Sequence, residues 1–163
     1  METSLPRGSV LRCRFPYEEN PHTPGPTWHY CLLSGQYEFA GDILVAVCYG
    51  TSAVDETLFA KHRGSILTVD KQFIKGIDLP KDRGSFIADR VALVPLHEEW
   101  IDLQHVGRLD IFREKKRMAD AQRASLFEDF GRIEKIMLRS TMDTAANFLK
   151  TGNVGLPPSK TLR

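Results

Sequence analysis

The chain has 163 residues, of which 42% are hydrophobic and 26% charged, and its formal net charge at pH 7 is +1. This length fits one domain, or one domain with an appendage, and a charge near zero argues against a surface uniformly attractive to nucleic acid or membranes. No apolar run approaches the roughly 20 residues that a membrane span requires, and the N-terminus lacks the pattern of a signal peptide. We therefore expect a cytoplasmic globular protein with no membrane partner.

The first hundred residues favour strands. Ser9–Phe15 alternates apolar and polar side chains, which is the period of a half-buried strand. The prolines of the loop 16–26 exclude a helix there, and two apolar runs follow, Trp28–Ser34 and Asp42–Gly50. Shorter or later strands are expected at Ser65–Val69, Gln72–Ile74 and Gly84–Val94, the last with a bend near Asp89 and Arg90. No helix-length pattern lies between these runs, so an antiparallel sheet is favoured over parallel βαβ units.

The last sixty residues favour helix, because glycine and proline nearly vanish between Val106 and Gly152. We expect one helix from near Leu109, a second built on a periodic apolar face, and a short third one after a capping sequence at Ser140–Asp143. The apolar face consists of Leu126, Phe130, Ile133 and Met137, widened by Phe127 and Leu138. The tail from Thr151, with its Gly and Pro residues, is expected to be disordered.

The charge divides along the same line. Residues 1–105 contain 10 Lys and Arg against 14 Asp and Glu, a balance of −4, and residues 106–163 contain 12 against 7, a balance of +5. This asymmetry indicates two functional parts. The sequence thus predicts a β-rich domain over 1–105, a helical extension over 106–150 and a tail over 151–163, which makes an α+β protein overall.

The three cysteines predict neither disulfides nor a metal site. Cys13, Cys31 and Cys48 are odd in number, show no CxxC spacing and lie in strand-like apolar runs. We expect them to be reduced core residues, and we expect no metal or other cofactor.

Four segments carry recognisable local motifs in this order along the chain: Arg7–Pro16, Trp28–Ser34, Ile43–Ser52 and Phe86–Pro95. Together they resemble the PemK/MazF family of toxin endoribonucleases. Arg7–Pro16 is similar to the opening glycine, strand and aromatic-Pro turn of that family, and Trp28–Ser34 to its second strand. Ile43–Ser52 resembles the central strand with its small-Thr-Ser turn, and Phe86–Pro95 the late strand with an Asp-x-Val signature. The resemblance covers about residues 7–100 and implies an SH3-like β-barrel that forms a homodimer.

The resemblance also implies a function, the metal-independent cleavage of single-stranded RNA by attack of the ribose 2′-hydroxyl on the adjacent phosphate, restrained by an antitoxin protein. The family's Arg at the start of the second strand and its Thr/Ser after the central strand carry over to His29, Thr51 and Ser52, which are the expected catalytic residues. His29-Tyr30 stands where the family usually has Arg-Pro. A histidine can transfer protons near neutral pH, but it does not supply the permanent bidentate clamp of an arginine.

Other residues are candidates for binding the RNA. Arg12 and Arg14 lie on the polar face of the first strand and are candidates to supply the missing positive charge. Stacking on bases is the candidate role of Trp28 and Tyr30, although core packing is expected for at least one of them. Phosphate contact is the candidate role of the basic patch Lys61, His62 and Arg63. His22 in the proline-rich loop is a candidate for a substrate lid, and the basic run Arg113–Arg117 for a partner contact.

Two functions stay open on the sequence. The chain is either the endoribonuclease toxin of a type II toxin–antitoxin pair, or a catalytically inactive PemK/MazF-like barrel that binds or regulates through its groove and helical extension. The missing arginine at position 29 and the long extension favour the second reading.

Overall fold

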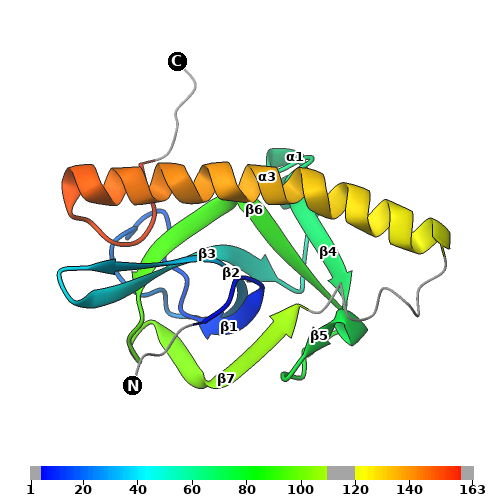
Figure 1. Cartoon of the computed structure of the whole chain (residues 1–163), viewed down its shortest axis with the longest axis horizontal. Coiled ribbons are helices and arrows are strands. Elements are labelled where there is room, and N and C mark those ends of the chain that lie inside the picture. Colours follow the sequence, from blue (N-terminus) through cyan, green and yellow to red (C-terminus); the bar gives the residue numbers. More distant parts are fainter. Residues whose placement is uncertain (1–4, 110–119, 159–163) are drawn as a thin grey trace.

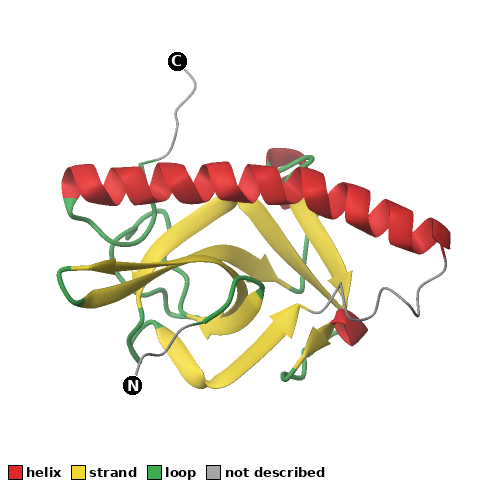
Figure 2. Ribbon diagram, in the orientation of Figure 1, coloured by secondary structure: helices red, strands yellow, loops and turns green. Residues whose placement is uncertain are grey.

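We analysed a computed structural model, which describes residues 5–109 and 120–158, with only the backbone over 120–129. Strands dominate the first part, and one long helix crosses them (Figures 1 and 2). The strands are β1 (Ser9–Cys13), β2 (His29–Phe39), β3 (Asp42–Thr51), β4 (Ile66–Asp70), β5 (Ile74–Lys75), β6 (Arg83–Pro95) and β7 (Ile101–Leu109). The helices are α1 (Glu56–Lys61), the 3-10 turn η1 (Lys71–Phe73) and α3 (Asp120–Thr151). A mainly β architecture with a C-terminal helix therefore agrees with the sequence expectation.

The seven strands form one antiparallel sheet in the order β4-β6-β3-β2-β1-β7-β5. β2 and β3 make a long hairpin whose two-residue turn, Ala40-Gly41, has positive φ at both positions (52° and 87°). Such a turn matches the twist of the paired strands and extends β2 to Phe39, beyond the expected end at Ser34. Register shifts in three strand pairs add bends to the sheet.

Both faces of the sheet are buried, because neighbouring residues of a strand point to opposite sides. In β3, Val45 and Val47 face one apolar cluster, closed by Phe15, Trp100 and Leu156. Ala46 and Cys48 face the other cluster, which α3 covers with Ile133 and Met137. All three cysteines are free and buried, as expected.

Two elements differ from the sequence expectation around β7. No strand was expected at Ile101–Leu109, where the boundary at 105 and a helix start near Leu109 had been placed. β1 pairs Leu11 with Val106 but Arg12 with Asp102, so residues 103–105 bulge out and hide the two-residue period. The segment expected as a strand at Gln72–Ile74 is mostly the turn η1, with only Ile74 and Lys75 paired to β7.

The expected break in the helix at Ser140–Asp143 is absent, since α3 runs unbroken to Thr151. The hydroxyl of Thr141 donates to the Met137 carbonyl (2.7 Å) and lies 2.7 Å from the Ser34 hydroxyl. The hydroxyl of Thr144 lies within reach of the Ser140 and Val91 carbonyls (2.8 and 3.2 Å). These side chains therefore pack the helix onto the sheet and do not cap a new one.

Residues 152–158, which follow α3, pack against the sheet, which differs from the disordered tail expected over 151–163; the rest of that tail lies outside the described residues. Gly155 exchanges backbone hydrogen bonds with Leu93 (2.6 and 2.9 Å), and Leu156 is buried. A Cβ at Gly155 would overlap the Pro21 carbonyl oxygen, and its φ of +100° also favours glycine. The described part of the chain contains no helix with the length and apolarity that crossing a membrane demands.

Candidate functional site

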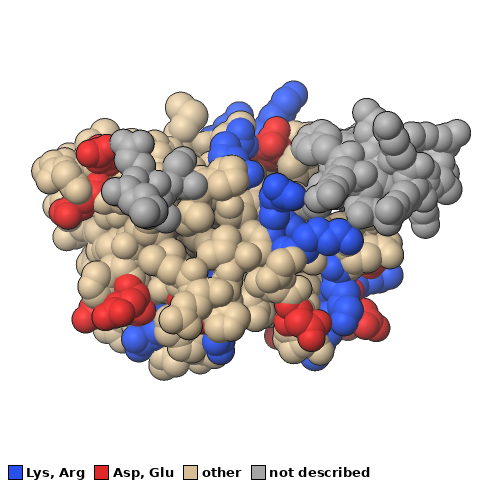
Figure 3. Space-filling model, turned by 60° about the horizontal axis from the view of Figure 1, so that its bottom comes forward, with Lys and Arg blue, Asp and Glu red and all other residues tan. Residues whose placement is uncertain are grey.

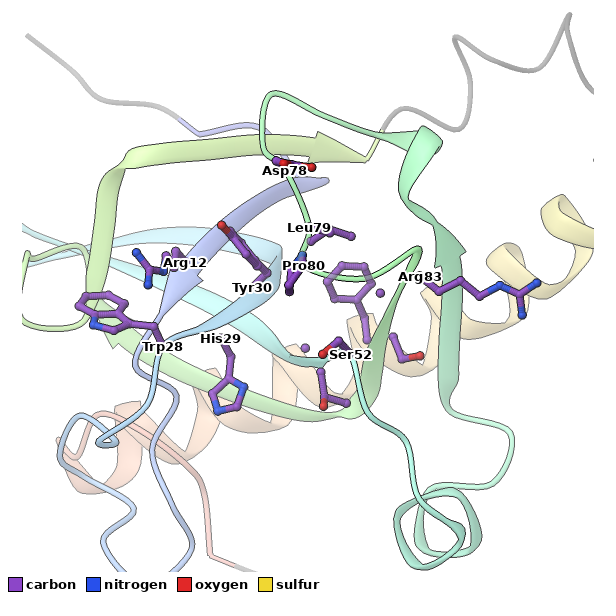
Figure 4. Close-up of a pocket in the computed structure, with 14 residues that line it drawn as sticks. Arg12, Trp28, His29, Tyr30, Ser52, Asp78, Leu79, Pro80 and Arg83 are labelled. Carbon is purple, nitrogen blue, oxygen red and sulfur yellow. The ribbon is translucent and has the colours of Figure 1, made fainter.

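A cavity of about 390 Å³ opens where β1, the start of β2, the end of β3 and the start of β6 meet. Five residues that the sequence predicted for the site line it (Figure 4). They are Arg12, Trp28, His29, Thr51 and Ser52. They come from three separate segments of the chain, so their meeting is a property of the fold.

The strand register explains how these segments meet. β1 pairs with β2 so that Arg12 faces Tyr30, one residue after His29. The end of β3 reaches the same place because Gly50 passes close to the Tyr30 backbone. A Cβ at Gly50 would overlap the Tyr30 carbonyl oxygen, so only glycine lets Thr51 and Ser52 approach the start of β2.

His29 is half-buried, and its ring centroid lies 5.0 Å from that of Tyr49. Burial lowers the pKa of His29 from its ordinary value of 6.5, and the positive charge of Arg90 lowers it further. The guanidinium carbon of Arg90 lies 4.8 Å from the centroid of the same Tyr49 ring. Near neutral pH the imidazole is therefore uncharged and able to accept a proton.

The two hydroxyl residues of the site differ in their surroundings. The Thr51 hydroxyl donates to the Ala53 carbonyl (3.2 Å) and accepts from the Ala53 amide (3.1 Å), so it closes a local turn. Ser52 lines the cavity, and Figure 4 shows its side chain between those of His29 and Arg83. Ser52 is accordingly the better placed of the two to donate to a bound group, and Thr51 shapes the turn that presents it.

Arg12 and Arg14 have separate roles although both lie near Trp28. The guanidinium of Arg12 is 5.5 Å from the Trp28 ring centroid, 3.6 Å from the Asp102 carboxylate, and lines the cavity. Arg14 donates to the carbonyls of Gly25 (2.8 Å) and Glu99 (3.3 Å) and does not line the cavity. Arg14 thus holds the proline-rich loop in place.

The remaining candidates lie away from the cavity. Lys61 pairs with Glu18 (3.4 Å) at the surface, and neither Lys61 nor Arg63 lines the cavity. The His22 ring lies 2.9 Å from the Val154 carbonyl oxygen, which ties its loop to the segment after α3 instead of leaving it as a lid. The run 113–117 lies outside the described residues.

Sequence reasoning missed several lining residues, chiefly Asp78, Arg83 and Ser85. Arg83 donates to Asp70 (3.0 Å) across the β4–β6 pair, a contact that depends on strand register. Asp78 belongs to an aperiodic loop, so no local pattern marks it. Tyr30, which also lines the cavity, was a candidate because it alternates with Trp28 on one strand face.

The chemistry available in the cavity combines an uncharged imidazole, hydroxyl donors, two guanidinium groups and an aromatic wall. Within the described residues no group of three or more His, Cys, Asp or Glu side chains is placed to hold a metal ion. On the face drawn in Figure 3, Lys and Arg side chains form a band, and Asp and Glu side chains gather in separate groups around it. On this face the basic side chains are therefore concentrated in one region and not spread evenly.

Comparisons with models of protein families, with curated proteins and with solved structures found no match to this chain.

Proposed function

We propose that the chain is a PemK/MazF-like endoribonuclease toxin of a type II toxin–antitoxin pair, with the strands arranged as an SH3-like barrel. The observation that carries the proposal is the convergence of Arg12, Trp28, His29, Thr51 and Ser52 on one cavity. The resemblance selected His29, Thr51 and Ser52 from sequence order alone, and Arg12 and Trp28, which were candidates for contact with RNA, line the same cavity.

The cavity residues suit cleavage of RNA by its own 2′-hydroxyl. Uncharged His29 accepts the 2′-proton while the 2′-oxygen bonds to phosphorus, and the bond to the 5′-oxygen breaks. The guanidinium of Arg12 and the Ser52 hydroxyl stabilise the negative charge that builds up on the phosphoryl oxygens. The leaving 5′-oxygen takes up a proton, which gives a 2′,3′-cyclic phosphate and a 5′-hydroxyl without a metal or other cofactor.

Trp28 suits a single-stranded substrate, because an unpaired base can stack on its ring. The cationic Arg12 lies beside the same ring, so a base and its phosphate would contact neighbouring groups. We further propose a cytoplasmic homodimer that is neutralised by an antitoxin protein.

The test is cleavage of a panel of single-stranded RNAs by the full chain in the presence of EDTA. We expect cyclic-phosphate products, and a rate lowered by about 10²–10⁴-fold in His29→Ala, because that is the usual contribution of a general acid or base. The matched control is His97→Ala, since His97 is exposed and does not line the cavity. Full activity of His29→Ala would remove His29 from the mechanism.

A second function, binding or regulation without catalysis, is favoured by the charge balance of the cavity. Both of its guanidinium groups already contact carboxylates, Arg12 with Asp102 (3.6 Å) and Arg83 with Asp70 (3.0 Å). Asp78 is a further acidic residue in the lining, and its carboxylate pairs with Lys71 (3.6 Å). RNA that binds to the wild-type chain without any cleavage product, with equal affinity for His29→Ala, would establish this function in place of the first.

A further inference from the structure

A larger cavity, of about 1030 Å³, lies on another part of the molecule and shares no lining residue with the candidate site. One wall is the α3 stretch from Lys135 to Asn147, and another is the part of β6 around Asp89 and Arg90. The loop at Glu18 and Pro21 and the segment 156–158 close the remaining sides. We call this cavity the α3 groove. Its residues are positioned by the register shift in β6, where Cys48 of β3 faces Val91 but Tyr49 faces Ile87.

Two residues that line the α3 groove have a buried side-chain nitrogen atom without a hydrogen-bond partner in the described part of the chain. Among the described residues, two buried side-chain nitrogen atoms have no hydrogen-bond partner, His62 Nε2 and Arg90 Nε. Both residues line this groove, and His62 is only 7% exposed. Buried polar groups in folded proteins are nearly always paired, so an unpaired one calls for a specific explanation such as a bound molecule.

Three carboxylates and three permanently cationic side chains line the α3 groove, and each of the three carboxylates has a partner of its own. Two of the carboxylates that line it are engaged, Asp89 with His62 (2.7 Å) and Glu18 with Lys61 (3.4 Å). The third carboxylate, Asp143, lies on α3 one turn beyond Arg139.

The cations of the groove come from two facing walls. Lys135 and Arg139 are one helical turn apart on α3, so their side chains extend from the same side of the helix. Arg90 lies across from them on β6, held over the Tyr49 and Phe15 rings at 4.8 and 5.5 Å. Among the described residues no carboxylate lies within salt-bridge distance of these three side chains.

The remaining lining is partly polar, from Ser140, Thr144 and Asn147, and partly apolar. Val91, Ile136 and Leu156 contribute aliphatic surface, and three prolines add flat rigid faces. A cavity of this size that offers both apolar surface and polar groups suits a small organic ligand.

We propose that the α3 groove binds a small organic phosphate with a flat apolar body, such as a nucleoside monophosphate. The phosphate group contacts Lys135, Arg139 and Arg90, and the ring lies against the prolines and aliphatic side chains. The proposal goes beyond the ribonuclease function and does not rest on it, because the two cavities have separate residues.

Calorimetric titration of the full chain with adenosine 5′-monophosphate tests the proposal. We expect saturable binding, and dissociation constants at least about tenfold higher for adenosine and for inorganic phosphate, since each lacks one half of the ligand. Lys135→Gln and Arg139→Gln are expected to raise the dissociation constant about tenfold each, the usual order for a charge-assisted contact. Both side chains lie on a helix surface, so the variants retain the fold.

The matched control is Lys81→Gln, which removes one positive charge outside the groove and should leave the dissociation constant unchanged. Arg12→Gln distinguishes the two cavities, because it alters the candidate site alone. Absence of binding at millimolar nucleotide would overturn the proposal. Binding that is weakened by Arg12→Gln and unaffected by Lys135→Gln and Arg139→Gln would also overturn it.

Discussion

His29 has a protonation state that depends on residues far from it in the sequence. Its pKa is lowered by burial and by the charge of Arg90, which lies 61 positions later, at the irregular part of β6. The neutral imidazole is the form that accepts a proton. The start of β2 therefore carries an uncharged imidazole, and the positive charge of the cavity comes from Arg12 of β1 and Arg83 of β6.

The pH dependence of the proposed RNA cleavage should reveal the lowered pKa of His29 and the contribution of Arg90 to it. Because the pKa of His29 is below 6.5, the unprotonated form persists as the pH falls, and the acid limb of the rate profile should lie below pH 6.5. Arg90→Gln removes the charge that disfavours the imidazolium, so the limb should move upward toward 6.5. Single-turnover rates over a pH series measure both positions.

Two controls separate charge from packing in that experiment. Arg90→Lys keeps a positive charge and should keep the limb near its wild-type position. Lys150→Gln removes a charge from the last turn of α3, away from the Tyr49 ring, and should leave the profile unchanged. An acid limb that is the same in Arg90→Gln and in the wild type would show that Arg90 does not act on the titrating group.

Helix α3 packs on the sheet with one side and is exposed to solvent on the other, and one methionine of the helix lies on each side. Met137 is 6% exposed in the cluster beneath α3, whereas Met142 is 69% exposed. Met137→Ala should lower the free energy of unfolding by about 2–4 kcal/mol, because it leaves a cavity in the core. Met142→Ala should change it by less than about 0.5 kcal/mol.

Denaturant unfolding of both variants measures the difference. Equal free energies of unfolding for the two alanine variants would contradict the packing of α3 described above. The comparison uses the same substitution in the same helix, so helix propensity contributes equally to both.

The spacing of apolar residues along the chain predicted several strands and one face of α3, because this spacing is a local property of the sequence. The strands around Ser9, Asp42 and Gly84 and the inward face of α3 at Ile133 and Met137 were found this way. Leu138, which was expected to widen that face, is exposed instead. The side chains of Leu126 and Phe127 lie outside the described part.

The missed features depend on pairing between distant segments. β7 was hidden by its bulge at 103–105, and the continuous path of α3 depends on threonine hydroxyls that bond within the helix and to the sheet. In the site, Arg83 is positioned by the pairing of β4 with β6, and Asp78 lies in a loop. Neither feature has a recognisable pattern in the local sequence. Arg12 could be predicted from the alternation of β1, and His29 and Ser52 from the resemblance of the segments in which they lie.

At the scale of the whole molecule, the acidic and basic parts of the chain share their core. Residue 105 lies inside β7, and Ile133 and Met137 of α3 belong to the same apolar cluster as Val10, Leu32 and others from the sheet. The expected division at 105 therefore describes the charge of the chain better than its packing.

A chain ended after Leu109 should lack a cooperative thermal transition, because the sheet face under α3 and the contacts of 154–156 would be open to water. Circular dichroism during heating measures the transition. Residues 110–158 added as a separate chain should restore it, which distinguishes lost packing from nonspecific misfolding. A truncated chain that melts cooperatively at the full-length midpoint would show that the first 109 residues fold alone.

The position of Arg90 has a thermodynamic consequence for the two cavities. Arg90 lines the α3 groove, and its positive charge also lowers the pKa of His29 in the other cavity. An anion that settles beside it cancels part of that charge and raises the proton affinity of the imidazole. By thermodynamic linkage, protonation of His29 must raise the affinity of the α3 groove for the anion by the same factor by which the bound anion raises the proton affinity of His29.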